Sequence, residues 1–550
     1  MKRTTPEFPD PEKREWDVIV IGTGMGGAVL GYALAKQGKS VLFVEKGKSH
    51  LNQNISLKGD FAEHFFLQME NSQLTHKQIL ERTGRWNDEI EDVSDSQSHS
   101  IVPFIGSGTG GSTALYGMAL ERFSPCDFVP KQNYPDAKES TLPEQWPVSY
   151  DELKPYYIAA EKLFRVRGTG DPLKENEPFD HLLPLPPITP VAQELYDFFC
   201  DKGLHPYRLP LACEFVSGCE CCQSYLCDKD CKNDSARICL KPAIDDFGAQ
   251  LIDECEVLKL ESARNKVSGV ICVRHDRLIS LRGKIVVLAA GALETPKILL
   301  NSVSPAWPHG LANESNMVGR NLMRHYIDLY AIIPKAKERF LTNFKDIALN
   351  DYYVFKEHKF GTVQSFGAMP PPSIITGDME KKLRSGALSF MSSLFKIVKP
   401  AAEFFISKLF SQRVILATIM EDLPYKDNLL TLSDKIDDMG RRRLLLCYQI
   451  NRYEQSRIKA FRKEISRLLK PYSFMLIKQA ENNERIAHAC GTCRFGLNPQ
   501  DSVLDRHNRA HGISNLYVVD SSFFPSSGGT NPALTIAANA LRVADHLKDQ

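Results

Sequence analysis

The sequence predicts an α/β protein, and two observations support this fold class. An apolar run at residues 17–21 leads into Gly22, Gly24 and Gly27 in a G-x-G-x-x-G pattern, followed by a helical stretch and a second apolar strand. A further continuous apolar strand lies at residues 284–290. Strands that are apolar throughout are typical of parallel sheets covered on both faces. We therefore expect a Rossmann-type nucleotide-binding domain.

Length and composition narrow the class of protein. At 550 residues the chain is long enough for two or more structural units, and its apolar and charged fractions are ordinary for a globular protein. The net charge of +1 gives no electrostatic support for a nucleic-acid partner. Residues 1–16 are polar, and no run of about eighteen uncharged apolar residues occurs. We expect no secretory signal, no membrane-spanning helix and a cytoplasmic location.

The first glycine motif lies inside a complete βαβ unit. Residues 28–37 form the expected helix, Gly38 ends it, and residues 40–45 form the next strand. Glycines let the main chain approach a pyrophosphate, and the helix N-terminus favours its negative charge. Glu45, about twenty residues beyond the motif, is placed to bind the ribose hydroxyls of a dinucleotide. A purely structural turn is the alternative, and the motif does not decide between FAD and NAD.

A second glycine-rich loop helps to choose the dinucleotide. It contains Gly106, Gly111 and Ser112, and Gly117 and Met118 follow it. Small residues allow the main chain to approach a flat ring system closely, which favours a flavin.

A third segment of small residues follows the strand at residues 284–290. The strand ends in a turn at Ala290 and Gly291. We expect the helix after this turn to begin at Pro296, because proline is tolerated in the first turn of a helix.

Seven of the fourteen cysteines fall in one short segment, at positions 213, 219, 221, 222, 227, 231 and 239. Because no export signal is expected, this cluster indicates metal or redox chemistry before a disulfide scaffold. Closely spaced thiolates suit an iron–sulfur cluster or zinc, since a short loop can fold several sulfurs around one centre.

Taken together, six blocks of the chain resemble the glucose-methanol-choline (GMC) oxidoreductases, a family of FAD-dependent alcohol oxidases and dehydrogenases. The blocks occur in the family's order and span the chain. They are residues 22–27 with Glu45, 106–118, 289–296, 317–323, 488–493 and 515–546.

The resemblance implies a GMC fold with two domains. A discontinuous FAD-binding domain would comprise residues 11–125, 232–325 and 485–550. Residues 326–484, which carry no nucleotide signature, would form a substrate-binding domain built largely of antiparallel sheet. Residues 126–231 would connect the two domains and contain the cysteine-rich loop.

The resemblance also implies a chemistry. Oxidation of an alcohol requires loss of the hydroxyl proton and of a hydride from the same carbon; flavin N5 takes the hydride, and the protein supplies a base. His488 matches the family's base, and Asn531 matches a second position that orients the substrate oxygen. Capping of the last helix is the alternative role for Asn531. His325 and His507 receive no role.

The motifs and the resemblance together assign the cofactor contacts. Pro532 would begin the final helix, whose N-terminus would point at the pyrimidine edge of the flavin. The main-chain amide after Asp520 would reach phosphate, and the main chain of Val257 would contact the adenine. The expected cofactor-binding residues are Gly22, Gly24, Gly27, Glu45, Gly106, Gly111, Ser112, Gly117, Met118, Val257, Ala290, Gly291, Asp520, Asn531 and Pro532.

The cysteine spacing adds a further implication. The pattern Cys-Cys-x₄-Cys-x₃-Cys resembles that in the catalytic subunits of bacterial FAD-dependent glucose dehydrogenases. It implies a [3Fe-4S] cluster held by Cys222, Cys227 and Cys231. Here lysine follows the last cysteine where that pattern has proline. Sterol and long-chain alcohol oxidases also have a cysteine-rich loop, so disulfides, free thiols and zinc stay as alternatives.

Residues 386–416 are rich in Phe, Leu and Ile, with lysines between them. Apolar residues at helical spacing predict a pair of amphipathic helices packed on the core. The alternative is a basic amphipathic hairpin that makes peripheral membrane contact or covers an apolar substrate channel.

The expected activity is FAD-dependent oxidation of a lipophilic alcohol to an aldehyde or ketone, with oxygen, a quinone or a redox protein as electron acceptor. One alternative is a sugar or polyol dehydrogenase that passes electrons through an iron–sulfur cluster. A second alternative is a flavoprotein without alcohol oxidation, such as a photodecarboxylase. The pairing of His488 with Asn531 argues against this second alternative.

Overall fold

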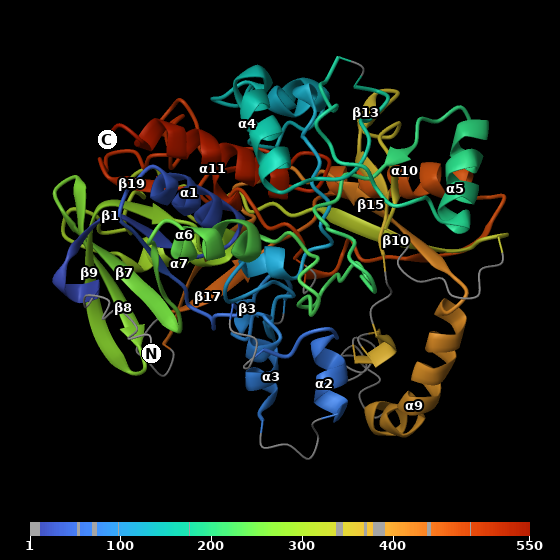
Figure 1. The fold of residues 1–550 in the computed structure, drawn as a ribbon, viewed down its shortest axis with the longest axis horizontal. Helices are drawn as coiled ribbons and strands as arrows, with labels where there is room; N and C mark the ends of the chain where they lie inside the picture. Colours follow the sequence, from blue (N-terminus) through green and yellow to red (C-terminus); the bar gives the residue numbers. More distant parts are fainter. Residues whose placement is uncertain are drawn as a thin grey trace, which may run out of the picture.

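Two large sheets dominate the molecule (Figure 1). The strands around β1 and β9 form the first sheet, and those around β10 and β15 form the second. The computed structural model describes residues 11–51, 56–68, 74–96, 98–174, 176–336, 345–367, 371–373, 375–377, 391–436, 442–483 and 486–550.

The first sheet is the predicted nucleotide-binding sheet. Its strand order is β6 (Gln250–Ile252), β2 (Val41–Val44), β1 (Glu15–Ile21), β9 (Arg277–Leu288), β8 (Lys266–Arg274) and β7 (Cys255–Ala263), with β19 (Leu516–Val518) also paired to β9. The strands β6, β2, β1, β9 and β19 are parallel neighbours, whereas β7 and β8 extend the sheet in antiparallel fashion. β9 joins both parts, because its first half pairs with β8 and its second half with β19.

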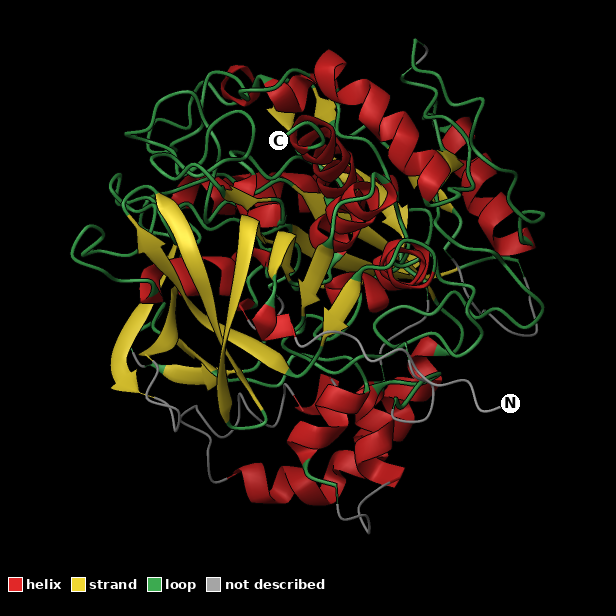
Figure 2. Cartoon of the chain, turned by 60° about the vertical axis from the view of Figure 1, so that its left-hand side comes forward, coloured by secondary structure: helices red, strands yellow, loops and turns green. Residues whose placement is uncertain are grey.

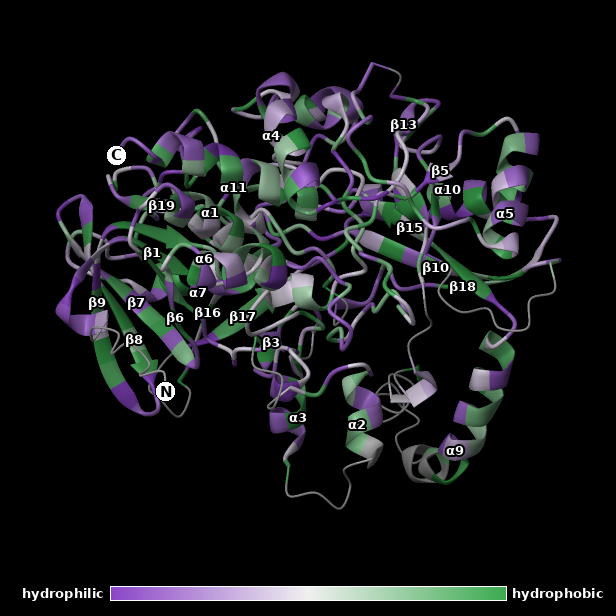
Figure 3. Ribbon diagram, in the orientation of Figure 1, coloured by the Kyte–Doolittle hydropathy of each residue, from purple (hydrophilic) through white to green (hydrophobic). Residues whose placement is uncertain are grey.

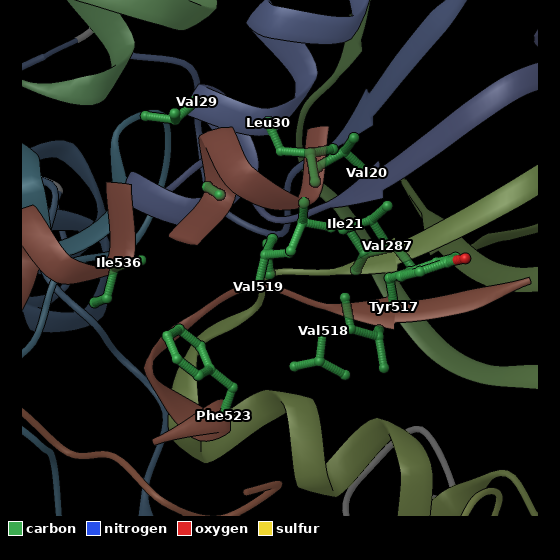
Figure 4. Close-up of a cluster of buried hydrophobic side chains, with 14 of the residues drawn as sticks. Val20, Ile21, Val29, Leu30, Val287, Tyr517, Val518, Val519, Phe523 and Ile536 are labelled. Carbon is green, nitrogen blue, oxygen red and sulfur yellow. The ribbon is translucent and has the colours of Figure 1, made fainter. Parts of the chain in front are cut away.

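Two helices pack against each other and against this sheet. They are α1 (Met25–Lys36), which Gly38 ends with a φ of +87°, and α11 (Ala533–Leu547). Figure 4 shows Leu30 of α1 beside Val20 of β1, and Val29 and Ile536 from the two helices belong to the same buried cluster. Burial of each such aliphatic side chain contributes roughly 1.5–3 kcal/mol, so this shared core holds the two ends of the chain together.

The second sheet is antiparallel throughout. Its order is β18 (Ser473–Ile477), β10 (Tyr326–Ile333), β15 (Val414–Met420), β14 (Gly361–Ser365), β11 (Ile347–Leu349) and β5 (Tyr207–Arg208). Alternate residues of β10 point to opposite faces. Tyr330 and Ile332 pack with Phe461 of α10 (Arg452–Leu468), whereas Ile327 and Leu329 face a cavity between the sheets. The predicted combination of a Rossmann-type domain with an antiparallel sheet is confirmed.

The remaining elements surround these sheets (Figure 2). A four-stranded sheet has the order β16 (Leu429–Ile436), β17 (Arg442–Cys447), β3 (Ile90–Asp92) and β4 (His99–Ile101). The small hairpin is β12 (Val354–Phe355) with β13 (His358–Lys359), and the other α-helices are α2 (Ala62–Gln68), α3 (His76–Arg82), α4 (Tyr150–Leu163), α5 (Pro190–Asp201), α6 (Lys241–Asp245), α7 (Gly291–Asn301) and α9 (Met391–Phe410). Short helical turns are η1 (Pro11–Lys13), η2 (Gly111–Ala114), η3 (Pro125–Phe128), η4 (Pro130–Asn133), η5 (Ala236–Leu240) and η7 (Ser521–Phe523).

The start of α7 differs from the prediction. The helix begins at Gly291, and Pro296 lies inside it. The reason is a distant cap, because the carboxylate of Asp520 accepts a hydrogen bond from the Gly291 amide (3.0 Å). A carboxylate at this position satisfies an N-terminal donor and the helix dipole together, and the sequence around Pro296 gives no sign of it.

The lysine-containing apolar stretch also differs from the predicted pair of packed helices. Residues 391–410 form one helix, α9, which continues through Pro400. Figures 1 and 2 place α9 with α2 and α3 in a group below the two sheets, and Figure 3 shows many of its residues in the apolar colour. Ile397, Phe404 and Phe405 are 76%, 65% and 69% exposed. Residues 386–390 lie outside the described residues. Within the described part of the chain, no helix combines the length and apolar character needed to cross a bilayer.

Candidate active site

A cavity of about 520 Å³ lies between the carboxyl ends of the parallel strands and the inner face of the second sheet. Ligand sites commonly occur at such strand ends, and this volume is typical of them. Thirteen of the fifteen residues expected to bind the cofactor line it: all except Gly27 and Met118. His488 lines the same cavity. The structure therefore brings together residues that are up to about 500 positions apart in the chain.

The first glycine motif is built on close main-chain contacts. Gly22 has a φ of +97°, and a Cβ on it would lie 2.3 Å from the carbonyl oxygen of Ala289. A Cβ on Gly27 would meet the Gly22 carbonyl oxygen at 2.1 Å, so Gly27 serves helix–strand packing. Gly24 differs, because nothing lies within 4 Å of an added Cβ. Gly24 therefore leaves open space at the start of α1, where the helix has no side-chain cap.

Glu45 braces the two glycine loops. Its buried carboxylate accepts hydrogen bonds from the amides of Thr23 (3.0 Å), Gly47 (3.0 Å) and Gly108 (3.3 Å), and from the Thr23 hydroxyl. Burial raises the pKa of Glu45, and these hydrogen bonds oppose that effect. Contact of Glu45 with a ribose stays a prediction.

The second glycine loop forms another wall of the cavity. Gly106, Gly111, Ser112 and Gly117 all line it, and the Gly106 amide donates to the Ser112 hydroxyl (3.2 Å). Met118 lies behind this wall, fully buried, with a φ of +62°. It packs in one apolar cluster with residues of the cysteine loop.

The third segment contributes Ala290 and Gly291, which Asp520 ties to the C-terminal region. The Asp520 carboxylate accepts from the Gly291 amide (3.0 Å) and from the Thr295 hydroxyl (2.5 Å). Val257, at the start of β7, also lines the cavity. Glycine turns without side chains, together with the uncapped start of α1, fit the pyrophosphate and flat rings of a dinucleotide such as FAD.

His488 and His325 are hydrogen-bonded to each other, with 2.9 Å between their Nδ1 atoms. His325 Nε2 also lies 2.9 Å from the carbonyl oxygen of Gly528. A carbonyl only accepts, so Nε2 of His325 carries the proton in this bond. Burial lowers the pKa of His325 to about 4, so this ring is neutral and its Nδ1 is an acceptor. The proton between the two rings therefore belongs to Nδ1 of His488.

This bonding pattern leaves Nε2 of His488 without a proton. Burial lowers the pKa of His488 well below 6.5, and the charge of nearby Lys345 lowers it further. His488 also has a left-handed backbone with a φ of +60°, a strained conformation that is frequent at functional sites. The side chain is thus held as a neutral imidazole with an unprotonated Nε2.

His325 is a site residue that sequence reasoning missed. An isolated histidine carries no spacing signal. The available hint was its position, two residues after the block at 317–323 and next to β10.

Asn531 presents an unused acceptor beside this pair. Its Oδ1 atom is buried and has no hydrogen-bond partner among the described residues. The side chain does not cap α11, whose N-cap is Pro532 without any side-chain bond, so the capping interpretation is wrong. A buried unpaired amide oxygen in a cavity wall indicates that a ligand group binds there.

A buried ion network fixes the loop that carries Gly528 and Asn531. Lys359 is ion-paired with Asp127 (2.5 Å) and with Glu421, and all three side chains are buried. Glu421 accepts from the Gly528 amide (3.2 Å), and the hydroxyl of Tyr353 accepts from the Gly529 amide (2.9 Å). Burial alone would lower the pKa of Lys359, but the two carboxylates raise it well above 10.5. The one ammonium thus pairs with two carboxylates, and the hydrogen bonds to Gly528 and Gly529 fix the loop.

Lys345 is a second residue that the sequence did not single out. It lines the cavity, is buried, and approaches Gln223 (3.1 Å). Burial lowers its pKa to about 8, so its ammonium is charged at neutral pH. A short polar stretch without a motif gave no reason to select it.

The rest of the second-sheet wall is mostly apolar. No carboxylate lines it among the described residues; its members are Ile327, Leu329, Gln364, Phe366, Ala417, Ile419, Ile477 and Gln479. This composition suits an uncharged organic group and offers nothing to neutralise a polycation.

Comparison with known proteins places the chain in a family. Two family models described as GMC oxidoreductase match residues 212–327 and 424–540, and one described as FAD binding domain matches residues 17–56. The chain is 29% identical to paromamine 6'-oxidase of Streptomyces fradiae, over 97% of this chain and 91% of that protein. It is 28% identical to 6'''-hydroxyparomomycin C oxidase of Streptomyces lividus, over 98% and 93%.

A solved structure agrees with the fold. Pyridoxine 4-oxidase from Mesorbium loti superposes with a TM-score of 0.60 at 19% identity, covering 97% of this chain and 99% of that one. The matched segments include the first glycine motif, the cysteine loop and both cavity histidines. The chain is therefore a member of the GMC family of FAD-dependent oxidoreductases.

Proposed function

We propose that this enzyme oxidises the hydroxyl group of a small, largely apolar alcohol to a carbonyl group, with His488 as the base. Two consecutive hydrogen bonds, from His325 to the Gly528 carbonyl and from His488 to His325, support the proposal most directly. They supply a neutral imidazole with a free Nε2 on the wall of a cavity that fits FAD.

The protein's part in the reaction follows from these contacts. FAD, when bound, supplies the acceptor for the hydride at flavin N5. His488 takes the hydroxyl proton at Nε2, while its Nδ1–H stays bonded to His325. The amide of Asn531 can turn its N–H₂ group or its oxygen toward the hydroxyl and fix its orientation. The ammonium of Lys345 on the same cavity wall favours negative charge on the substrate oxygen.

The substrate class follows from the second-sheet wall. The names of the two relatives indicate that they oxidise paromamine and 6'''-hydroxyparomomycin C. In this chain the second-sheet wall is mostly apolar, and its one charged side chain among the described residues is that of Lys345, a cation. A neutral or anionic alcohol with an apolar body suits this wall better than an aminoglycoside, because burying an ammonium there would leave it unpaired.

Anaerobic reduction of the bound flavin in the dark tests this proposal. We expect medium-chain and benzylic alcohols to bleach the flavin absorbance, and glucose and paromamine to bleach it far more slowly. His488→Ala should keep the flavin and lose the reaction. If no alcohol reduces the flavin in the dark, a flavoprotein without alcohol oxidation, such as a photodecarboxylase, replaces the proposal. Oxygen uptake, quinone reduction and redox-protein reduction then identify the electron acceptor.

A second candidate is a sugar or polyol dehydrogenase with an iron–sulfur relay through Cys222, Cys227 and Cys231. It is favoured by one observation: Gln223 and Ser224, which follow Cys222, line the same cavity. Acid-labile sulfide and a paramagnetic resonance signal, with glucose as the fastest reductant, would support it. If neither acid-labile sulfide nor the resonance signal is found, the iron–sulfur relay is excluded.

We also propose that α9 contacts an anionic membrane surface. Ile397, Phe404 and Phe405 are exposed on this helix, and Lys399 and Lys408 lie on it as well. Phe404→Ser with Phe405→Ser should abolish co-sedimentation with anionic vesicles. Leu278→Ser, at an equally exposed apolar residue of β9, is the matched control and should bind like the wild type.

A further inference from the structure

Six cysteine sulfurs gather in the segment from Cys213 to Cys231. The Sγ atoms of Cys213 and Cys219 are 3.6 Å apart, and those of Cys219 and Cys231 are 3.1 Å apart. The sulfurs of Cys213, Cys219 and Cys221 all lie within 4.8 Å of one another. All fourteen cysteines, each of which the structure describes, are free of disulfides.

This segment has little else to hold its shape. Between β5 and η5 the described chain forms isolated bridges and turns but no helix or strand. Four non-glycine residues have left-handed backbones: Phe215, Cys221, Ser224 and Asp230. Such conformations persist only where the surroundings impose them, and thiols are weak hydrogen-bonding groups. A cross-link between the sulfurs would supply the missing constraint.

The sulfur distances discriminate between kinds of cross-link. A disulfide joins its sulfurs at about 2.05 Å, far shorter than the separations here. Four thiolates at about 2.3 Å from one tetrahedral ion stand about 3.8 Å from each other. In a [3Fe-4S] cluster each cysteine binds a different iron atom, so the ligand sulfurs lie further apart. The observed 3.1 and 3.6 Å around Cys219, and the 3.4 Å between Cys227 and Cys231, are nearest to the single-ion arrangement.

We propose that Cys213, Cys219 and Cys221 bind one tetrahedral divalent metal ion together with Cys231, whose sulfur lies beside those of Cys219 and Cys227, and that zinc fits four thiolates best. Buried Lys232, next in the chain to Cys231, offsets part of the excess negative charge. The site is closed, with four protein ligands and no open position, so its role is structural.

The metal site would stabilise the second glycine loop, which forms one wall of the cavity, from the side away from the cavity. Met118 packs in the same cluster as Cys213, Cys221 and Cys231. The buried ammonium of Lys232 donates to the carbonyls of Ala114 (2.8 Å) and Tyr225 (2.9 Å), linking the two loops. Metal loss would therefore loosen the second glycine loop. This role is independent of which alcohol the enzyme oxidises.

Metal analysis of the purified holoenzyme tests the proposal. We expect one zinc per chain, no acid-labile sulfide, and release of that zinc when an organomercurial blocks the thiols. Cys213→Ser and Cys219→Ser should each lower the zinc content at least tenfold and lower the melting temperature. Two control variants should keep the zinc. Cys222→Ser changes a cysteine of the alternative iron–sulfur relay that is not a ligand of the proposed zinc site, and Cys200→Ser changes an exposed cysteine.

Several outcomes would overturn it. Labile sulfide that is lost in Cys222→Ser but kept in Cys213→Ser would assign an iron–sulfur cluster instead. Thiols that all react freely with no metal present, or a disulfide found by mass spectrometry, would also reject the ion. If Cys213→Ser does not fold, the mercurial titration of the wild-type enzyme still tests the proposal. The release of one zinc ion must then accompany the blocking of four thiols.

Discussion

The two ends of the cavity are built in different ways. At the end formed by the parallel sheet, main-chain turns make the wall, and an added Cβ on Gly22 or Gly106 would lie 2.3 or 2.4 Å from another main-chain oxygen. At the end formed by the second sheet, side chains such as His325, Lys345 and Phe366 make the wall. The first end tolerates very few residue types, and the second tolerates many. The first therefore suits a fixed cofactor and the second a variable substrate.

The largest expected effect on flavin content and stability comes from a substitution at the cavity end that main-chain turns form. Gly22→Ala places a methyl group against the Ala289 carbonyl and strains a backbone with positive φ, at roughly 1–3 kcal/mol for the strain alone. We expect loss of bound flavin and a lower yield of folded protein. Gly24→Ala, which meets nothing within 4 Å, should fold normally and weaken only FAD binding. Flavin content and melting temperature separate the two, and equal behaviour would refute the distinction.

The next effect comes from His488, the proposed base at the side-chain end of the cavity. His488→Ala should lower kcat by roughly 10²–10⁴-fold, the usual contribution of a general base, without loss of FAD. Stopped-flow flavin reduction measures this step directly. His507→Ala, at a histidine that stacks on His546 away from the cavity, is the control and should be as active as the wild type. Loss of flavin from the His488 variant would mean that its role is in folding.

The hydrogen-bond partner of the base gives a smaller effect. His325→Leu removes the acceptor for Nδ1–H of His488, so the tautomer is no longer fixed, and we expect a roughly 10- to 100-fold lower kcat. His325→Asn keeps an acceptor in a similar place and should recover part of the rate. If both variants are equally slow and equally unstable, His325 has a structural role and does not position the base.

The smallest effect concerns the charge at Lys345. The proposed base must be neutral, so we expect the rate to fall as the pH drops below the pKa of His488, which lies well below 6.5. Lys345→Met removes one cause of that lowered pKa, so the fall should begin at a higher pH. The two enzymes should converge above pH 8, where Lys345 itself loses its proton, because its pKa is about 8. Lys345→Arg retains the charge and should keep the wild-type profile of kcat/KM against pH.

The same contrast explains what the sequence could predict. Gly22, Gly111 and Gly291 were recognisable because turns with positive φ or close main-chain approach restrict the residue type. The strand at residues 284–290 was recognisable from its continuous apolar character. His325 and Lys345 were missed because each lies just before a strand of the second sheet, β10 or β11, where an isolated residue carries no spacing signal. The start of α7 was wrong because its cap, Asp520, comes from a distant segment.

The late position of β19 and α11 has a consequence for synthesis of the enzyme. Val286 of β9 pairs with Leu516, so its partner leaves the ribosome some 230 residues later. Until residues 516–547 have been translated, β9 has an open edge and the apolar face of α1 lacks α11. Nascent chains of this enzyme therefore need protection from aggregation for most of translation, and FAD can be loaded only after the polypeptide is nearly complete.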